Sequence, residues 1–126
     1  MNNDELNTFL AREVMGWHIG TIITRFSKEV IECYKDKNDK AVMLIQGWHP
    51  TTDIAQAMMC TEKWCDDAGG HYSLEGGFEG SGEFVYHVVL KKWNPRSQSH
   101  KRYTGEGTKE LAICLALYES KKGGEK

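Results

Sequence analysis

The spacing of the apolar residues changes repeatedly along this chain, and the order of those changes constrains the fold most. Three segments carry apolar residues at helical spacing: 3–15, 53–68 and 108–121. Five segments are rich in the β-branched and aromatic residues that strands favour: 19–26, 29–34, 41–46, 71–75 and 83–93. The order α, three β, α, two β, α predicts an αβα sandwich of the α+β class, with about five antiparallel or mixed strands in one sheet and helices on both sides.

The expected helix ends carry capping residues. Asn2, followed by Glu5, suits the start of the first helix, and the run Thr51–Asp53 suits the start of the second. Gly69 can adopt the left-handed conformation that ends a helix. Thr108 is the expected cap of the third helix, whose centre LAICLALY is apolar nearly all round and is therefore expected to be deeply packed. The polar end of the chain, 118–126, is expected to fray.

Two strands are predicted to lie in the middle of the sheet. Segment 41–46 has apolar residues at both parities, which favours a strand covered on both faces. In segment 83–93, Phe84, Tyr86 and Val88 would line one face, and the residues between them the other. The glycine-rich stretch 69–82 is expected to be a flexible loop and a possible lid, and 94–107 is expected to be a loop.

Length and composition indicate one soluble domain, 1–126, without general affinity for nucleic acid. A chain of 126 residues can bury a single core, and it has no apolar run long enough to span a bilayer. The pI is near 6.2, whereas a general nucleic-acid binder usually has an excess of basic residues and a higher pI. The first ten residues, MNNDELNTFL, have acidic and amide side chains where an export signal would need positive charge and then an apolar stretch, so we expect a bacterial cytoplasmic protein with free thiols at its four cysteines.

Three blocks of sequence carry a resemblance to a known family. They are Glu5-Leu6 through Val14-Met15-Gly16-Trp17, then Trp48-His49-Pro50-Thr51-Thr52-Asp53-Ile54-Ala55-Gln56-Ala57 with Glu62-Lys63-Trp64, and Leu111-Ala112-Ile113-Cys114-Leu115-Ala116-Leu117. In these blocks the chain resembles the phage ABA sandwich domain family of small bacteriophage and prophage proteins. The resemblance implies an αβα sandwich and a phage origin. It supplies no catalytic residue, because no activity is established for that family.

Few residues are arranged for catalysis or metal binding. The five histidines are dispersed, and no nucleophile elbow or metalloprotease spacing accompanies them. Cys60 and Cys65 lie five residues apart on one helix, about 140° around its axis, which does not suit a shared metal. We therefore predict no catalytic residue, no metal and no cofactor, although an enzyme that acts on a nucleotide stays open as an alternative.

Charge is segregated in the second half of the chain. Between Asp66 and Leu90 there are five acidic residues and no lysine or arginine, whereas 91–102 carries five basic residues and no acidic one. The basic stretch could lie against the acidic glycine-rich loop, where exposed pairs contribute at most about 1 kcal/mol each. Alternatively, its charge is directed at an anionic ligand.

The ligand interpretation gives a set of candidate binding residues. Arg96, Lys101, Arg102 and Lys109 could converge on one anion, beside the stacking rings of Trp93 and Tyr103. Backbone and hydroxyl donors at the start of the last helix would come from Gly105, Gly107 and Thr108. Trp48 and His49 precede the second helix and could be part of the same pocket, although a purely structural role for this motif is the other interpretation.

The predicted function is non-enzymatic binding of a small anionic molecule, in its concrete form the sequestration of a nucleotide-derived signal used in host defence against phage. The alternatives are a protein-interaction module that inhibits a host protein and the nucleotide-acting enzyme. A homo-oligomer is expected because exposed sheet edges favour self-association, and no membrane partner is expected.

Overall fold

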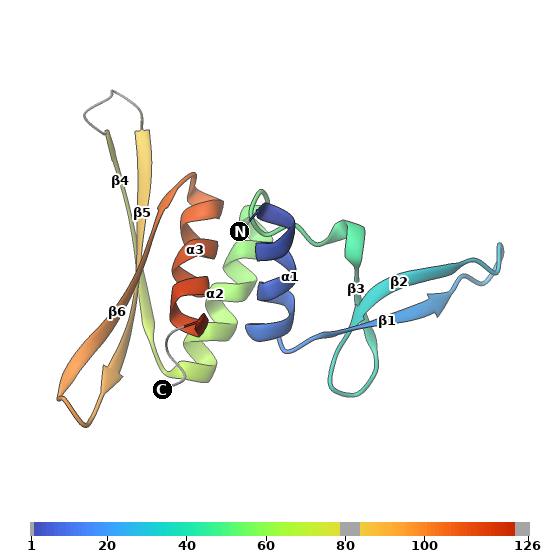
Figure 1. The fold of residues 1–126 in the computed structure, drawn as a ribbon, viewed down its shortest axis with the longest axis horizontal. Helices are drawn as coiled ribbons and strands as arrows, with labels where there is room; N and C mark the ends of the chain where they lie inside the picture. Colours follow the sequence, from blue (N-terminus) through green and yellow to red (C-terminus); the bar gives the residue numbers. More distant parts are fainter. Residues whose placement is uncertain (1, 79–83, 123–126) are drawn as a thin grey trace.

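The computed structural model describes residues 2–78 and 84–122, which form three α-helices, a short 3-10 helix and six strands (Figure 1). The helices are α1 (Asn3–Glu13), η1 (Ile45–Gly47), α2 (Ile54–Ala68) and α3 (Lys109–Lys122). The strands are β1 (His18–Ile23), β2 (Val30–Lys35), β3 (Ala41–Leu44), β4 (His71–Phe78), β5 (Phe84–Asn94) and β6 (Ser99–Gly107).

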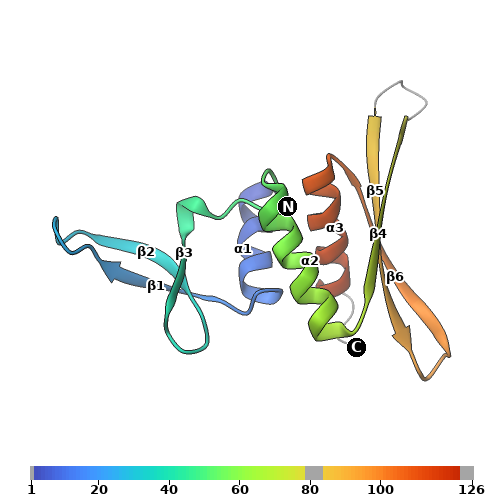
Figure 2. The same cartoon turned by 180° about the vertical axis from the view of Figure 1, so that it is seen from behind.

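The strands form two separate sheets, each an antiparallel three-stranded meander. The N-terminal sheet has the order β1-β2-β3, and the C-terminal sheet has the order β4-β5-β6. Figures 1 and 2 show the three helices between the two sheets. The α+β class and the antiparallel pairing are confirmed, but the single sheet of about five strands with helices on both sides is wrong. The two meanders pair only within themselves, because the helices lie between them.

The helix signals read from the sequence are confirmed. The Asn2 side chain accepts a hydrogen bond from the backbone N–H of Glu5 at 2.8 Å, and Asp53 caps α2 by accepting from the N–H of Gln56 at 3.1 Å. Gly69 has a φ of 65° and ends α2 in the left-handed conformation. The hydroxyl of Thr108 accepts from the N–H of Leu111 at the start of α3.

The C-terminal sheet packs one face against α3. Val88 and Leu90 on β5 are buried, and so is Tyr103 on β6. Gly105 lets the two backbones approach closely, because a Cβ atom at this position would lie 2.1 Å from the carbonyl oxygen of Ala112. The central position predicted for segment 83–93 is confirmed within this sheet, and so is the deep packing of the last helix.

The N-terminal sheet projects from the helices and is largely uncovered. Segment 41–46 was predicted to be central, but β3 is an edge strand whose Ala41, Val42 and Leu44 are exposed, so that prediction is wrong. The strand does carry apolar residues at both parities, but none of the described helices covers it. The sheet is held to the helices mainly at the start of β1, where the Trp17 ring contacts the rings of Tyr34 and Trp48.

Three local predictions about loops and the chain end need correction. Residues 99–107 of the expected loop form β6, a polar strand whose outward side chains face solvent, so the sequence lacks an apolar alternation. The predicted strand 71–75 is confirmed as part of β4, which continues to Phe78, so residues 76–78 of the expected glycine-rich loop belong to a strand, and residues 79–82 lie outside the described part of the chain. Fraying from 118 onward is wrong as far as Lys122, because α3 continues and Ser120 is buried. The last four residues are not among those described.

The thiols are free, as predicted, and three of the four are buried: Cys33, Cys60 and Cys114. Burial raises the pKa of the Cys60 thiol to about 12 and also raises that of Cys114. These groups behave as small apolar side chains of the core. None of the described helices has both the length and the apolar character needed to cross a membrane.

Candidate functional site

The basic stretch singled out in the sequence forms the far end of the β5–β6 hairpin. A hollow of about 430 Å³ lies there, in the range of small-molecule sites. Its lining comes from the end of β5, the turn and the start of β6: Lys92, Trp93, Asn94, Pro95, Arg96, Lys101 and Tyr103. The turn is shaped by Gln98, with a φ of 51°, and by the Asn94 side chain, which accepts from the Arg96 N–H at 3.0 Å.

Two pairs of like charges face each other across this hairpin. In the register of β5 and β6, Lys91 lies opposite Arg102 and Lys92 lies opposite Lys101. Such directly opposed like charges destabilise a sheet unless another charge compensates them. The folded hairpin therefore holds a concentrated positive charge.

None of these basic side chains forms an ion pair with a described carboxylate. The ion pairs found among residues 2–78 and 84–122 involve other residues, such as Lys35 with Asp39 and Lys63 with Asp67. The predicted pairing with acidic residues of the glycine-rich loop would fall on Glu79 and Glu83, which lie outside the described residues. The nearer Glu75 lies opposite His87, four positions along β5 from Lys91.

Aromatic rings accompany the charges. Trp93 is 49% exposed, and the centre of its ring lies 5.2 Å from that of His100. Tyr103 is largely buried, with its ring edge-on to Trp64, and the Lys101 ammonium lies 5.7 Å from its centre. An exposed indole beside cations that pair with no described carboxylate offers both a stacking surface and a counter-charge.

The structure does not bring all the predicted basic residues together. Arg96 and Lys101 line the hollow, whereas Arg102 points to the opposite face of the sheet because neighbouring residues of a strand alternate. Lys109 follows the other end of β6, roughly 20 Å from Lys101 at the rise of an extended strand. The predicted convergence of these four residues on one anion is therefore wrong.

The residues predicted to supply donors at the start of α3 have structural roles instead. Gly105 is buried against the backbone of α3, and Gly107 has a φ of 138° at the junction with the helix. Thr108 caps α3, and the Lys109 ammonium lies 5.2 Å from the centre of the Tyr86 ring. Sequence spacing could not show that β6 places these residues far from the basic hairpin end.

Trp48 and His49 lie on the other side of the helices, toward the N-terminal sheet. Trp48 is buried, and its indole Nε1 donates to the backbone carbonyl of Asn7 at 2.8 Å. This favours the structural interpretation of the motif. His49 is exposed, and both residues border a separate hollow of about 290 Å³ beside α1.

Sequence reasoning missed several residues of the hairpin site. Lys92, Asn94 and Pro95 line the hollow, and Lys91 and His100 lie beside it. The signal that could have found them is the turn-forming pair Asn94-Pro95 between two polar stretches, which is typical of a hairpin.

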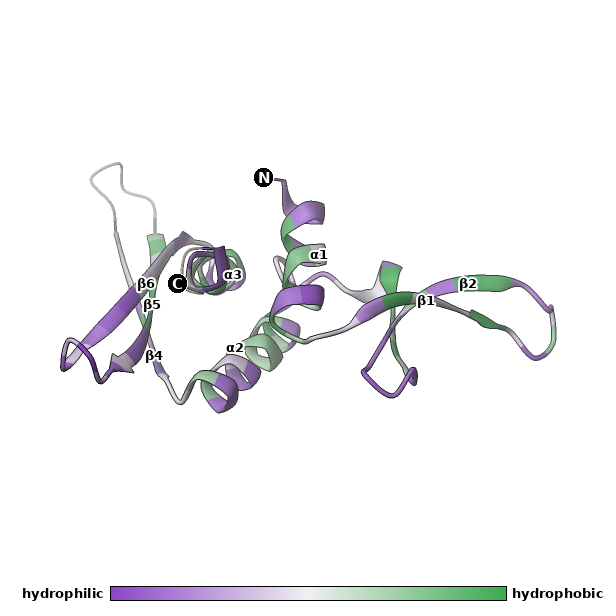
Figure 3. Cartoon of the chain, turned by 60° about the horizontal axis from the view of Figure 1, so that its bottom comes forward, coloured by the Kyte–Doolittle hydropathy of each residue, from purple (hydrophilic) through white to green (hydrophobic). Residues whose placement is uncertain are grey.

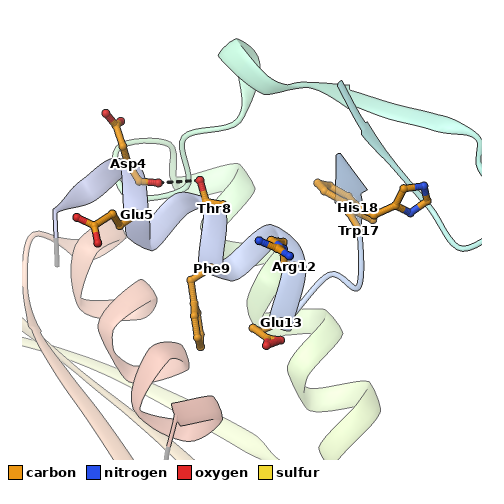
Figure 4. A pocket seen from close by; sticks show the side chains of 8 residues that line it. All are labelled: Asp4, Glu5, Thr8, Phe9, Arg12, Glu13, Trp17 and His18. Carbon is orange, nitrogen blue, oxygen red and sulfur yellow. Dashed lines mark hydrogen bonds between the residues drawn. The ribbon is translucent and has the colours of Figure 1, made fainter. Parts of the chain in front are cut away.

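A larger hollow, of about 840 Å³, lies between the outer side of α1 and the start of β1 (Figure 4). Sequence analysis did not indicate it. We call it the α1 groove, and it is lined by Asp4, Glu5, Thr8, Phe9, Arg12, Glu13, Trp17 and His18. Figure 4 shows that its polar groups include three carboxylates and one guanidinium. An anionic ligand therefore fits the hairpin site better than this groove.

Compared with protein-family models and with curated proteins, the chain matches none of them. The resemblance to the phage ABA sandwich domain family stays a prediction from the sequence blocks.

Proposed function

We propose that the protein binds a small anionic molecule that carries an aromatic base, of the nucleotide type, in the hollow at the end of the β5–β6 hairpin. The observation that supports this most is the set of basic side chains around the hollow, Lys92, Arg96 and Lys101, which have no carboxylate partner among the described residues. A bound phosphate would compensate the like charges of Lys92 and Lys101, which the hairpin places opposite each other beside the hollow.

The aromatic residues narrow the class of ligand. Trp93 offers a half-exposed indole at the rim, where a flat base can stack, and each stacked base contributes about 1–3 kcal/mol. A bare phosphate or sulfate would use the cations but not the indole. A mononucleotide or a small cyclic oligonucleotide would use both.

The proposal involves binding without chemistry. Among residues 2–78 and 84–122, no group of three metal-ligating side chains gathers at one place, and the hollow has no histidine or carboxylate in its lining. Retention of an unchanged ligand is what sequestration of a nucleotide-derived signal requires. The phage origin and the role against host defence belong to the same proposal.

Calorimetric titration with a panel of nucleoside mono-, di- and triphosphates and cyclic dinucleotides tests this directly. The double variant Arg96→Ala/Lys101→Ala should weaken binding at least tenfold, since it removes two of the cations of the hollow. The matched control is Lys63→Ala/Lys109→Ala, which removes the same charge from α2 and from the start of α3. The control should bind as the unchanged protein does.

A second variant separates the phosphate from the base. Trp93→Ala should reduce affinity for nucleotides and leave affinity for inorganic pyrophosphate nearly unchanged, because only the base stacks. Equal loss for both ligands would contradict the stacking role. Absence of binding to every member of the panel, together with no small anion released from protein purified from its native cells and then denatured, would overturn the proposal.

A separate measurement tests the alternative that the protein is an enzyme acting on a nucleotide. Ligand recovered by denaturing the complex after prolonged incubation should have the same mass as the ligand supplied. Accumulation of a cleaved product in proportion to protein concentration would favour an enzyme instead.

A further inference from the structure

The β1–β2 hairpin projects from the molecule and carries apolar side chains that nothing in the described chain covers. Figure 3 shows hydrophobic residues on β1 and β2 far outside the layer of helices. We call residues 18–35 the arm. Its exposed apolar side chains, with their exposed fractions, are Ile19 (47%), Ile23 (70%), Phe26 (97%) and Val30 (67%).

The single chain exposes more surface than a compact monomer of its mass. The single chain exposes 8145 Å², whereas a compact monomer of 14.3 kDa is expected to expose about 6,800 Å². The excess is about 1,300 Å². A standard protein interface buries about 800 Å² on each partner, and interfaces of permanent dimers bury more.

The free edge of β1 lacks the features that keep sheet edges apart. Natural edge strands are protected by lysine, proline, bulges or short length. β1 has six residues, HIGTII, with no lysine, acidic residue or proline, and it pairs with β2 without a bulge. The opposite edge, β3, has four residues, and the ladder beside it is irregular at Tyr34/Lys35. β1 is therefore the edge suited to pairing.

We propose that two copies of the chain associate through antiparallel pairing of their β1 strands, which joins the two N-terminal sheets into one six-stranded sheet. A two-fold axis perpendicular to the sheet keeps the same face of both copies on the same side, so residues of equal parity lie opposite each other. With Thr21 opposite Thr21 of the second copy, Ile19 of each copy lies opposite Ile23 of the other. The exposed isoleucines then cover one another.

The same register brings the tip of each arm to the α1 groove of the other copy. Position 24 of one copy lies opposite His18 of the other, and the turn that carries Phe26 continues toward Trp17. The tip also carries Arg25 and Lys28, both exposed.

The chemistry of the groove complements that of the tip. Its lining includes the apolar rings of Phe9 and Trp17, and its three carboxylates, Asp4, Glu5 and Glu13, outnumber its one guanidinium. An apolar ring flanked by two cations is suited to such a groove. The groove and the arm thus form two parts of one interface.

Sedimentation analysis over a range of micromolar concentrations tests the association. We expect a dimer. The variant Ile23→Lys places a charge on the β1 edge and should raise the dimer dissociation constant at least tenfold. The matched control is Val30→Lys, since Val30 lies directly opposite Ile23 on β2 and is similarly exposed, but one strand away from the edge. It should have a much smaller effect.

Comparison of these two variants separates edge pairing from other associations. An equal loss of dimer in both would show that the arms pack face to face and would overturn edge pairing. A monomer at all concentrations, or a dimer insensitive to Ile23→Lys, would overturn it as well. Circular dichroism serves as the folding control, and because both positions are largely exposed, both variants should retain their helical signal.

A cross-link tests the register. Thr21→Cys should oxidise to a covalent dimer, because directly opposite residues of an antiparallel pair have Cα atoms close enough for a disulfide. Glu32→Cys, directly opposite Thr21 on β2, should not. Cross-linking through position 32 but not 21 would contradict the register.

A substitution at Phe26 tests the proposed contact between the tip of the arm and the α1 groove of the second copy. Phe26→Asp should weaken the dimer, whereas Met59→Asp, which adds the same charge at an exposed apolar residue of α2, should not. Equal dimer strength in the two variants would show that the tip does not occupy the groove. Nucleotide binding at the β5–β6 hairpin should survive all of these changes, since that site lies in the other sheet.

Discussion

The two sheets of this protein share one topology but differ in what covers them. Each is an antiparallel three-stranded meander, yet the C-terminal sheet has one face against α3, whereas the N-terminal sheet projects from the helices. In the first, Val88 and Leu90 are buried; in the second, Ile23 and Val30 are about two-thirds exposed. Apolar residues in a strand thus indicate a surface that favours burial, while the partner that buries it can be a helix of the same chain or another molecule.

The two sheets also differ in where their charged side chains lie. The outer face of the C-terminal sheet carries charged and polar side chains, and the basic end of the β5–β6 hairpin forms the proposed ligand site. The N-terminal sheet has little charge on its β1 edge and forms the proposed contact with a second copy. Each sheet would therefore have its own binding role, at opposite sides of the layer of helices (Figures 1 and 2).

The largest loss of stability is expected where the backbone of the C-terminal sheet contacts the backbone of α3. In Gly105→Ala, the new Cβ would meet backbone atoms of Ala112 and Ala116, which cannot move independently of α3. We expect a loss of about 3 kcal/mol in the free energy of unfolding, measured by urea denaturation. Gly20→Ala is the matched change in the N-terminal sheet, where the Cβ would meet only the flexible side chain of Lys35. It should cost less than about 1 kcal/mol, and similar losses for both would contradict the comparison.

A smaller effect is expected where the N-terminal sheet joins the helices. Trp48→Phe keeps an aromatic ring against Trp17 but removes the donor to the buried carbonyl of Asn7. Leaving that acceptor unsatisfied should lower the free energy of unfolding by about 1–3 kcal/mol. Trp93→Phe, at the half-exposed indole of the other sheet, should change it by less than about 0.5 kcal/mol. Thermal or urea unfolding of the two variants measures both losses of stability. A larger loss in Trp93→Phe than in Trp48→Phe would show that the hydrogen bond of Trp48 does not anchor the N-terminal sheet to the helices.

The smallest effect concerns an exposed ion pair of the N-terminal sheet. The hydrogen bond from His18 at 3.1 Å, followed by the charge of Lys35, lowers the pKa of Asp39 below its ordinary value of 3.8. Because the folded pKa is the lower one, the stabilisation is present above pH 3.8 and is lost as the pH falls through the folded pKa. Asp39→Asn, which tolerates the positive φ at this position, should be slightly less stable than the unchanged protein at neutral pH.

The pH dependence provides the control for this variant. The difference between Asp39→Asn and the unchanged protein should disappear in acid below the folded pKa, where the aspartate is protonated. Unfolding midpoints measured from pH 7 to pH 2 give this comparison. A difference that persists unchanged in acid would show that the interaction is not electrostatic.

Local features were predictable from the sequence because they depend on neighbouring residues. The caps at Asn2, Asp53 and Thr108, the helix end at Gly69 and the central strand 83–93 are all confirmed. The strand β6 was not predictable, because its sequence, SHKRYTGEG, is polar with a single aromatic residue and two glycines, and such a composition resembles a loop. Its partner β5 supplies the pairing that makes it a strand.

The candidate site was predictable only in part. The charge reversal at Lys91 and the ring of Trp93 are visible in the sequence, and the structure places Arg96 and Lys101 with them at one hollow. The predicted contribution from the start of α3 failed because a strand of nine residues extends between the two ends. A chain position eight residues away is close in a helix and far in a strand, so the distance depends on a structure that the sequence pattern did not reveal.

The sequence by itself determined the three helices, their caps, the first three strands and the concentration of positive charge in residues 91–102, since each depends on interactions within a few residues. Only the tertiary structure decided that the strands divide into two sheets, that the helices lie between them and that one sheet is left uncovered. Those outcomes depend on which apolar surfaces meet across the whole chain. Local periodicity shows that a face favours burial, but only packing decides what covers it.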